Sequence, residues 1–202
     1  SSLFKLFNLC KIYIHEQNSF IGKVNLFFLP MVDSIFLNFD KTINLKKKFL
    51  KKSYKVGMPR KLLNNFDQKQ TEDKKNEKLI VFIYGGSQGA IKIIKNFINI
   101  VLKLDTKYHE NLYLIIQAPK NQFDFIKDNL DKIKIEYKLN FFYQDIQKIL
   151  SKSDLIISRA GAGTIDDIIN FKKPSILIPF PYSLNDHQFI NARYLSDKKL
   201  YE

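Results

Sequence analysis

The strongest constraint on the fold is a repeated pattern, in which an apolar run ends at a glycine-rich turn and a helical stripe follows. Residues 79–84 read Leu-Ile-Val-Phe-Ile-Tyr and precede Gly-Gly-Ser-Gln-Gly at 85–89. Residues 154–158 read Asp-Leu-Ile-Ile-Ser and precede Arg-Ala-Gly-Ala-Gly at 159–163. Continuous runs of this kind are typical of strands buried on both faces of a parallel sheet. The pattern predicts a doubly wound α/β fold with helices on both faces.

The rest of the chain fits the same alternation. We predict strands over 79–84, 112–117, 135–142, 154–158 and 175–179, and helices over 90–104, 121–130, 145–150, 164–171 and 186–195. Residues 1–57 give a smaller version, with strands at 11–14 and 34–39 around a helix at 22–29. Three short elements do not bury a full core, so we expect residues 1–57 to be the end of a domain whose first half is absent.

A polar stretch divides these two parts. Residues 64–78 contain almost no apolar side chain except Phe66, which is typical of a linker or a long surface loop. The predicted organisation is therefore an incomplete domain at 1–57, a linker at 58–78, and a second domain at 79–202.

Composition excludes several classes of protein. The single cysteine, Cys10, excludes an internal disulfide framework, and three scattered histidines do not suggest a metal cluster, so no metal or cofactor is expected. The net charge is +13, but only three of the 33 basic residues are arginine, the residue on which base-specific readers rely, so no nucleic-acid partner is expected. We also expect no membrane span and no signal peptide, and a cytosolic location. Cys10 is expected to be a buried thiol, His109 a surface residue, and His15 and Arg159 structural.

The two glycine turns are the candidate site. Glycines let backbone N–H groups approach an anion, and the helix that follows adds positive charge at its N-terminus. Ser87 can donate to a phosphate oxygen or cap its own helix, and Gly85, Gly86 and Gly89 could instead merely allow a tight turn. We expect Thr164 to be an N-cap, with Asp166 and Asp167 in the first helical turn. Capping alone explains these three residues, but a carboxylate there can also accept both hydroxyls of a ribose.

Two such turns in one domain favour a nucleotide diphosphate. Neither turn matches the G-x-G-x-x-G dinucleotide fingerprint, and no Gly-Lys-Ser/Thr follows either turn. Binding of NAD and hydrolysis of ATP are therefore disfavoured. A nucleotide-sugar site remains, because it needs a pyrophosphate cradle without either fingerprint.

Five short motifs, in order along the chain, resemble the MurG family of bacterial transferases. They are His15-Glu-Gln-Asn18 with Gly22-Lys-Val-Asn25, Val56-Gly-Met-Pro59, Gly85-Gly-Ser-Gln-Gly-Ala90, Ser158-Arg-Ala-Gly-Ala-Gly-Thr164, and His187-Gln-x-x-Asn-Ala192. The resemblance implies a GT-B fold, built of two Rossmann-like domains facing across a cleft, the first of them incomplete here. It also implies inverting transfer of N-acetylglucosamine from UDP-N-acetylglucosamine to undecaprenyl-linked lipid I, forming lipid II for peptidoglycan.

The resemblance also assigns substrate-binding residues. Ser87 would contact the diphosphate, Gln188 and Asn18 the sugar, and the backbone of Tyr143 the uracil. The turn holding the ribose and diphosphate would comprise Ala162, Gly163, Thr164, Ile165, Asp166 and Asp167. Asp167 stands where the family has a longer Glu. A family arginine aligns with Lys61 without a gap, or with Arg60 after a shift of one residue. The family's glycine-rich acceptor loop is absent, so no catalytic residue is assigned and this chain is expected to show little turnover.

Three partners or roles stay open beside this one. The lysines between residues 46 and 55 would either form a solvated face or attract anionic lipid on the cytoplasmic face of the bacterial inner membrane. The chain could instead be the donor-binding subunit of a split lipid-linked transferase, although the element at His15–Asn18 belongs to the other domain. Nucleic-acid binding is suggested by charge alone.

Overall fold

The computed structural model describes residues 10–59, 78–85 and 90–197. The chain forms two compact units. The first comprises residues 1–61, 161–166 and 181–202, and the second comprises residues 62–160 and 167–180. This division groups residues 181–202 with the N-terminal segment, whereas the sequence analysis assigns them to the second domain, and the domain boundaries 1–57, 58–78 and 79–202 stay a prediction.

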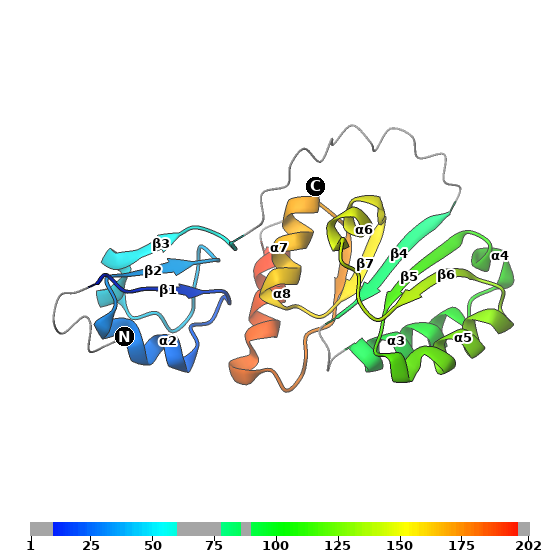
Figure 1. The fold of residues 1–202 in the computed structure, drawn as a ribbon, viewed down its shortest axis with the longest axis horizontal. Coiled ribbons are helices and arrows are strands. Elements are labelled where there is room, and N and C mark those ends of the chain that lie inside the picture. The colour runs from blue at the N-terminus through cyan, green and yellow to red at the C-terminus, as the bar shows by residue number, and fades with distance from the viewer. Residues whose placement is uncertain (1–9, 60–77, 86–89, 198–202) are drawn as a thin grey trace. The chain divides into compact units, whose positions relative to one another are not determined.

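The first unit contains a three-stranded parallel sheet with the order β1-β2-β3 (Figure 1). Its elements are β1 (Tyr13–Glu16), α2 (Lys23–Phe28), η1 (Leu29–Met31), β2 (Ser34–Leu37), η2 (Lys47–Lys52), β3 (Ser53–Lys55), η5 (Leu184–Asp186) and α8 (His187–Asp197). Ile21, Leu29 and Ile35 are fully buried in a small core to which Phe49 of η2 also contributes. The Nε2 atom of His15 donates to the carbonyl oxygen of Gly57 at 2.9 Å, which is a structural contact, as expected for His15.

The second unit contains a five-stranded parallel sheet with the order β6-β5-β4-β7-β8. Its elements are β4 (Leu79–Tyr84), α3 (Ala90–Val101), α4 (Thr106–His109), β5 (Leu112–Gln117), η4 (Lys120–Gln122), α5 (Phe123–Lys132), β6 (Glu136–Asn140), α6 (Ile146–Lys152), β7 (Leu155–Ser158) and β8 (Ser175–Leu177). Helix α7 (Ala162–Phe171) joins β7 to β8 and is shared between the two units. The sheet is wound outward from β4 in both directions, which confirms the predicted doubly wound topology.

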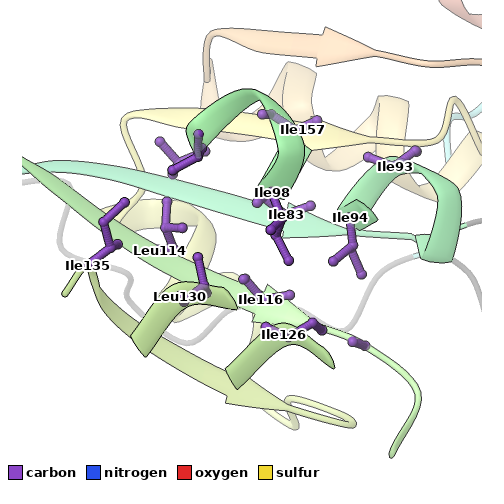
Figure 2. Packing of buried hydrophobic residues seen from close by; sticks show 13 residues of the cluster. Ile83, Ile93, Ile94, Ile98, Leu114, Ile116, Ile126, Leu130, Ile135 and Ile157 are labelled. Atoms are coloured by element: carbon purple, nitrogen blue, oxygen red, sulfur yellow. The ribbon is translucent and has the colours of Figure 1, made fainter. Parts of the chain in front are cut away.

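The main core lies between this sheet and the helices α3 and α5. Figure 2 shows Ile83 of β4 and Leu114 and Ile116 of β5 meeting Ile94 and Ile98 of α3. Ile126 and Leu130 of α5 complete the cluster, and α6 lies against β4 on the opposite face (Figure 1). Successive residues of β4 are buried, with Val81 on one face and Phe82 on the other, as the continuous apolar run predicts.

Several predictions from sequence need correction. The lysine-rich segment forms η2 and β3, which the charge density concealed, and the short helix α4 was not predicted. His109 is buried, not at the surface, because its Nε2 atom bonds the carbonyl oxygen of Val101 at 3.0 Å and thereby satisfies the ring. Cys10 is exposed rather than buried. Within the described residues, no helix combines the length and the apolar character needed to cross a bilayer.

Candidate functional site

The strand order places a topological switch point between β4 and β7. One crossover leaves β4 toward β5, and the chain returns to the other side of β4 as β7, so helices on opposite faces diverge at this point. The carboxyl ends of the two strands are in register, with Tyr84 opposite Ser158. Ligands of doubly wound folds bind beyond such an edge. Both glycine turns of the sequence follow these two strands, so the fold starts them from neighbouring positions.

Only part of the first turn is described. Gly85 follows β4 directly, while Ser87 and the rest of the turn lie outside the described residues, as do Arg60 and Lys61. At the end of β7, the hydroxyl of Ser158 is buried, and within the described parts of the chain it has no hydrogen-bond partner. A polar group is therefore available at the switch point.

The second turn enters its helix earlier than the sequence predicts. Helix α7 begins at Ala162, and the N–H of Ile165 donates to the carbonyl oxygen of Gly161 at 3.0 Å. Thr164 is therefore the third helical residue and not the N-cap, and Asp166 and Asp167 lie in the second turn, not the first. The low helix propensity of glycine suggested a later start.

The backbone conformation of this turn does not require glycine. Only Gly57, among the described glycines, has a φ in the left-handed range, at +76°, so Gly161 and Gly163 could carry a side chain without backbone strain. A Cβ atom at Gly161 would make ordinary contact with Thr164 Oγ1 at 3.8 Å. A Cβ atom at Gly163 would have no atom of the described residues within 4 Å. As far as the described residues are concerned, the space in front of Gly163 is therefore open.

Arg159 braces the segment after β8, in line with its expected structural role. Its side chain is buried, Nη1 donates to the carbonyl oxygens of Ile178 and Pro179 at 3.0 Å each, and the guanidinium lies 5.4 Å from the ring centre of Phe180. Burial lowers the pKa of this arginine from its ordinary value, and the two carbonyl oxygens stabilise the guanidinium charge. Arg159 thus holds the loop that leads toward η5.

Tyr143 directs its side chain into the protein. The ring is buried and packs edge-on against Phe82 at 6.2 Å, and its hydroxyl donates to the carbonyl oxygen of Lys138 at 3.2 Å. Burial raises the pKa of this phenol to about 12. The side chain therefore anchors the segment after β6, and only its backbone is left for a ligand. The preceding residues, Phe141 and Phe142, are exposed.

Within the first unit, Asn18 is tied to helix α8. The Nδ2 group of Asn191 donates to Asn18 Oδ1 at 3.2 Å, and Asn191 is completely buried. Gln188 is the second residue of this helix and is half-buried. The structure therefore brings the loop of Asn18 and the helix of Gln188 together. A second hydrogen bond links α8 to the N-terminal segment of this unit: the hydroxyl of Tyr194 donates to Asp40 Oδ2 at 3.0 Å.

Sequence reasoning missed the role of Glu16. This carboxylate is 3% exposed and accepts hydrogen bonds from the backbone N–H groups of Asn18 (3.0 Å) and Gly22 (2.8 Å) and from the side chain of Asn25 (2.9 Å). Together these bonds fix the loop that carries Asn18. The glutamate at the end of this short β-run was visible in the sequence, but its burial was not. In the described residues, no group of three or more metal-ligating side chains is assembled.

A parallel, doubly wound sheet with two glycine turns at its switch point defines a Rossmann-like domain of the type found in nucleotide-sugar transferases. The chain belongs to glycosyltransferase family 28, because residues 80–202 match the family's C-terminal domain. This match confirms the predicted α/β, GT-B-type fold class.

Curated relatives support the membership. The chain is 38% identical over 93% of its length to the UDP-N-acetylglucosamine–N-acetylmuramyl-(pentapeptide) pyrophosphoryl-undecaprenol N-acetylglucosamine transferase of Rickettsia canadensis, and covers 53% of that protein. It is 32% identical over 99% of its length to the transferase of the same name from Campylobacter jejuni strain RM1221, again covering 53%. The crystal structure of Acinetobacter baumannii MurG has the same fold, with a TM-score of 0.74 at 23% identity, over 98% of this chain and 54% of that one. The chain thus spans about half the length of the relatives it matches.

Proposed function

We propose that this chain provides the donor-binding half of a MurG-type transferase, which moves N-acetylglucosamine from UDP-N-acetylglucosamine to the muramyl sugar of undecaprenyl-linked lipid I. The observation that carries the proposal is the open space in front of Gly163, at the start of α7 and after a strand of the switch point. Neither the backbone conformation nor any atom of the described residues demands glycine there, and a glycine at this point allows a ligand to approach the backbone closely. The N-terminus of α7 favours an anion.

The proposed contacts follow the parts of the donor. The backbone of residues 162–165 would face the diphosphate, together with Ser87 and a basic residue at position 60 or 61. Asp166 and Asp167, in the second turn of α7, would reach the ribose hydroxyls from further along the helix than the sequence predicts. The backbone of Tyr143 would bind the uracil, and Asn18 and Gln188 the sugar.

The proposed chemistry is a single inverting displacement. A hydroxyl oxygen of the acceptor forms a bond to the anomeric carbon, the bond from that carbon to the UDP oxygen breaks, and the hydroxyl proton leaves to a base. Negative charge grows on the departing diphosphate. The N–H groups at the start of α7 would stabilise that charge, which is electrostatic catalysis.

The chain spans about half the length of the relatives it matches, which bears on its domains and its turnover. We propose the domain division 1–57, 58–78 and 79–202, and we expect the 202 residues alone to bind donor with little or no turnover. Robust synthesis of lipid II by this chain would contradict that expectation. The second candidate, a donor-binding subunit that acts with a separate membrane protein, would be favoured if turnover appeared only after such a partner was added.

We also propose that the chain works at an anionic membrane surface, on the cytoplasmic face. Lys46, Lys47, Lys48 and Lys51 of the η2 region are exposed, and Leu50 between them is 54% exposed. Each lysine near an anionic surface contributes about 1 kcal/mol. Cosedimentation with vesicles should increase with the phosphatidylglycerol content and decrease when these four lysines are replaced by glutamine. Binding that ignores lipid charge would refute this part.

The test of donor binding is calorimetric titration with UDP-N-acetylglucosamine, using UDP-glucose, ATP and NAD as controls. We expect selective binding of uridine nucleotides, with preference for the N-acetylglucosamine form. The titration is repeated on Asp167→Ala, which should weaken binding if this carboxylate accepts the ribose hydroxyls. If no uridine nucleotide binds, the proposed function is wrong for this chain.

A further inference from the structure

The last residue of β5, Gln117, carries a polar atom that the fold leaves without a partner. Its Oε1 atom is buried, and among the described residues it has no hydrogen-bond partner. The residue as a whole is half-buried, so part of it reaches the surface. A buried acceptor that lacks a donor costs desolvation free energy. A ligand that donates a hydrogen bond to this oxygen would recover that cost.

The alternation of side chains along the strands shows which face of the sheet Gln117 occupies. Ile116 of β5 and Ile83 of β4 belong to the core under α3 and α5 (Figure 2), so the residues that follow them lie on the opposite face. These residues are Gln117 and Tyr84, and the register that pairs Ile83 with Ile116 places them next to each other at the strand ends. The ring of Tyr84 stacks on that of Phe82 at 4.5 Å, in line with this face. Gln117 therefore lies at the carboxyl edge of the sheet, beside the strand that leads into the first glycine turn, where ligands of doubly wound folds bind.

The segment after β6 belongs to the same edge and the same face. The ladder between β5 and β6 ends with Gln117 opposite Asn140, the last residue of β6. The side chain of Tyr143 then reaches back across β5, which lies between β6 and β4. Its ring meets that of Phe82 on β4 at 6.2 Å, and its hydroxyl lies 3.5 Å from the carbonyl oxygen of Ile116. The amide of Gln117 and the backbone of Tyr143, which we propose to bind uracil, are therefore placed at one edge of the sheet and on one face of it.

The chemistry of a side-chain amide matches the polar edge of uracil. This edge carries one donor, N3–H, between two carbonyl acceptors. An amide offers an acceptor and an NH2 donor side by side, so Oε1 can accept from N3–H while Nε2 donates to one uracil carbonyl. The other uracil carbonyl is left for a backbone N–H group, such as that of Tyr143. Because Oε1 has no hydrogen bond to a described residue, turning this oxygen toward a base breaks no such bond.

We propose that Gln117 is a base-recognition residue of the donor site. Its amide pairs with the N3–H edge of a uracil base, next to the backbone contact of Tyr143. This inference rests on the proposed binding of a uridine nucleotide and adds a side-chain contact to it. It also gives a reason for a polar residue directly after three buried apolar ones, Leu114, Ile115 and Ile116.

The test separates the base from the rest of the nucleotide. Calorimetric titration of the 202-residue chain compares UDP with ribose 5-diphosphate, which has the sugar and the diphosphate but no base. Gln117→Met keeps the length of the side chain and removes both hydrogen-bonding groups. It should lower affinity for UDP about ten-fold, the effect of one or two hydrogen bonds, and leave affinity for ribose 5-diphosphate unchanged. Gln122→Met is the matched control, since Gln122 is a half-buried glutamine of η4, before the helix that covers the opposite face, and its replacement should change neither affinity.

The stability of the ligand-free chain distinguishes recognition from a structural role. If no protein group donates to Oε1, Gln117→Met should leave the urea midpoint unchanged or raise it, because an apolar atom replaces a buried polar one. A lower midpoint would assign the amide a structural role and overturn the proposal. In NMR spectra of the wild-type chain, the side-chain NH2 signals of Gln117 should shift when UDP is added and stay in place when ribose 5-diphosphate is added.

The outcomes keep this proposal apart from the proposed function. If the wild-type chain binds UDP, and Gln117→Met either keeps that affinity or loses affinity for both ligands equally, the role of Gln117 is overturned and the proposed function stands. If the wild-type chain binds no uridine nucleotide, both are overturned.

Discussion

Tyr84 and Ser158 face each other across the last register position of β4 and β7, where the sheet reverses its winding direction. Because the strands end together, the turn after each strand leaves the sheet from a neighbouring position. The two glycine segments begin 74 residues apart in sequence, at Gly85 and Arg159, and the topology alone explains why their starting points meet. The first prediction concerns the second of these turns.

Replacement of Gly163 by alanine should separate stability from binding. The Cβ atom would enter open space in a helical backbone, and alanine is favoured over glycine in helices by about 0.5–1 kcal/mol, so the free energy of unfolding should rise. The same Cβ would block close approach of a diphosphate, so affinity for UDP should fall at least about ten-fold. Urea unfolding and calorimetry measure the two effects. A variant that is more stable and binds UDP as well as the wild type would remove the ligand-based reason for this glycine.

The sequence was most informative where burial is continuous. Strands β4 and β5 begin and end at the predicted residues, because an uninterrupted apolar run is stable only where both faces of the strand are buried. Strand β3 was missed, since Lys51, Lys52 and Lys55 conceal a segment whose pairing with β2 is made by backbone atoms. The start of α7 was placed two residues late for a different reason: the glycines were assigned to a turn, whereas the N–H of Ile165 already donates to the carbonyl oxygen of Gly161.

The candidate site also contains some features that the sequence predicted and others that it did not. Local patterns identified the glycine turns, and the family resemblance identified the motif around Asn18. The bond between Asn18 and Asn191 joins residues 173 positions apart, and the hydrogen bonds of Glu16 depend on its burial. A single sequence carries no direct record of either contact. Ser87 and Arg60 lie outside the described residues, so their roles stay predictions.

The core of the second unit should respond strongly to loss of a single side chain. Ile98 of α3 is fully buried between the helix and the sheet, so Ile98→Ala should lower the free energy of unfolding by about 2–5 kcal/mol. Ile100, two residues later in the same helix, is 59% exposed, and Ile100→Ala should change the free energy by no more than about 0.5 kcal/mol. Chemical denaturation of both variants tests the assignment. Equal losses would contradict the described helix orientation.

Two neighbouring lysines, Lys51 and Lys52, should also differ in how much they contribute to the free energy of unfolding. The ammonium of Lys52 donates to the carbonyl oxygens of Leu29 and Val32 at 2.6 Å each and lies 5.3 Å from the ring centre of Phe49. Lys52→Met leaves both carbonyls without this charged donor and should cost about 1–3 kcal/mol in unfolding free energy. Lys51 is exposed, so Lys51→Met should leave stability nearly unchanged while weakening binding to anionic vesicles. If Lys52→Met weakened vesicle binding without a loss of stability, Lys52 would belong to the membrane face instead.

Alkaline pH should destabilise the protein through Tyr143. Burial raises the pKa of its phenol to about 12, whereas an unfolded tyrosine ionises near pH 10. Between these values the folded state binds more protons than the unfolded state, so stability is fully present below pH 10 and falls as the pH rises toward 12. Tyr137 contributes in the same direction, since burial and a hydrogen bond to Asp131 also raise its pKa to about 12.

Urea midpoints at pH 8, 9.5 and 11 measure how steeply the stability falls with pH. Tyr143→Phe should lower stability at pH 8 by about 1 kcal/mol, through loss of the hydroxyl bond, and should flatten the decline above pH 10. A decline as steep in Tyr143→Phe as in the wild type would show that this phenol does not ionise late in the folded protein.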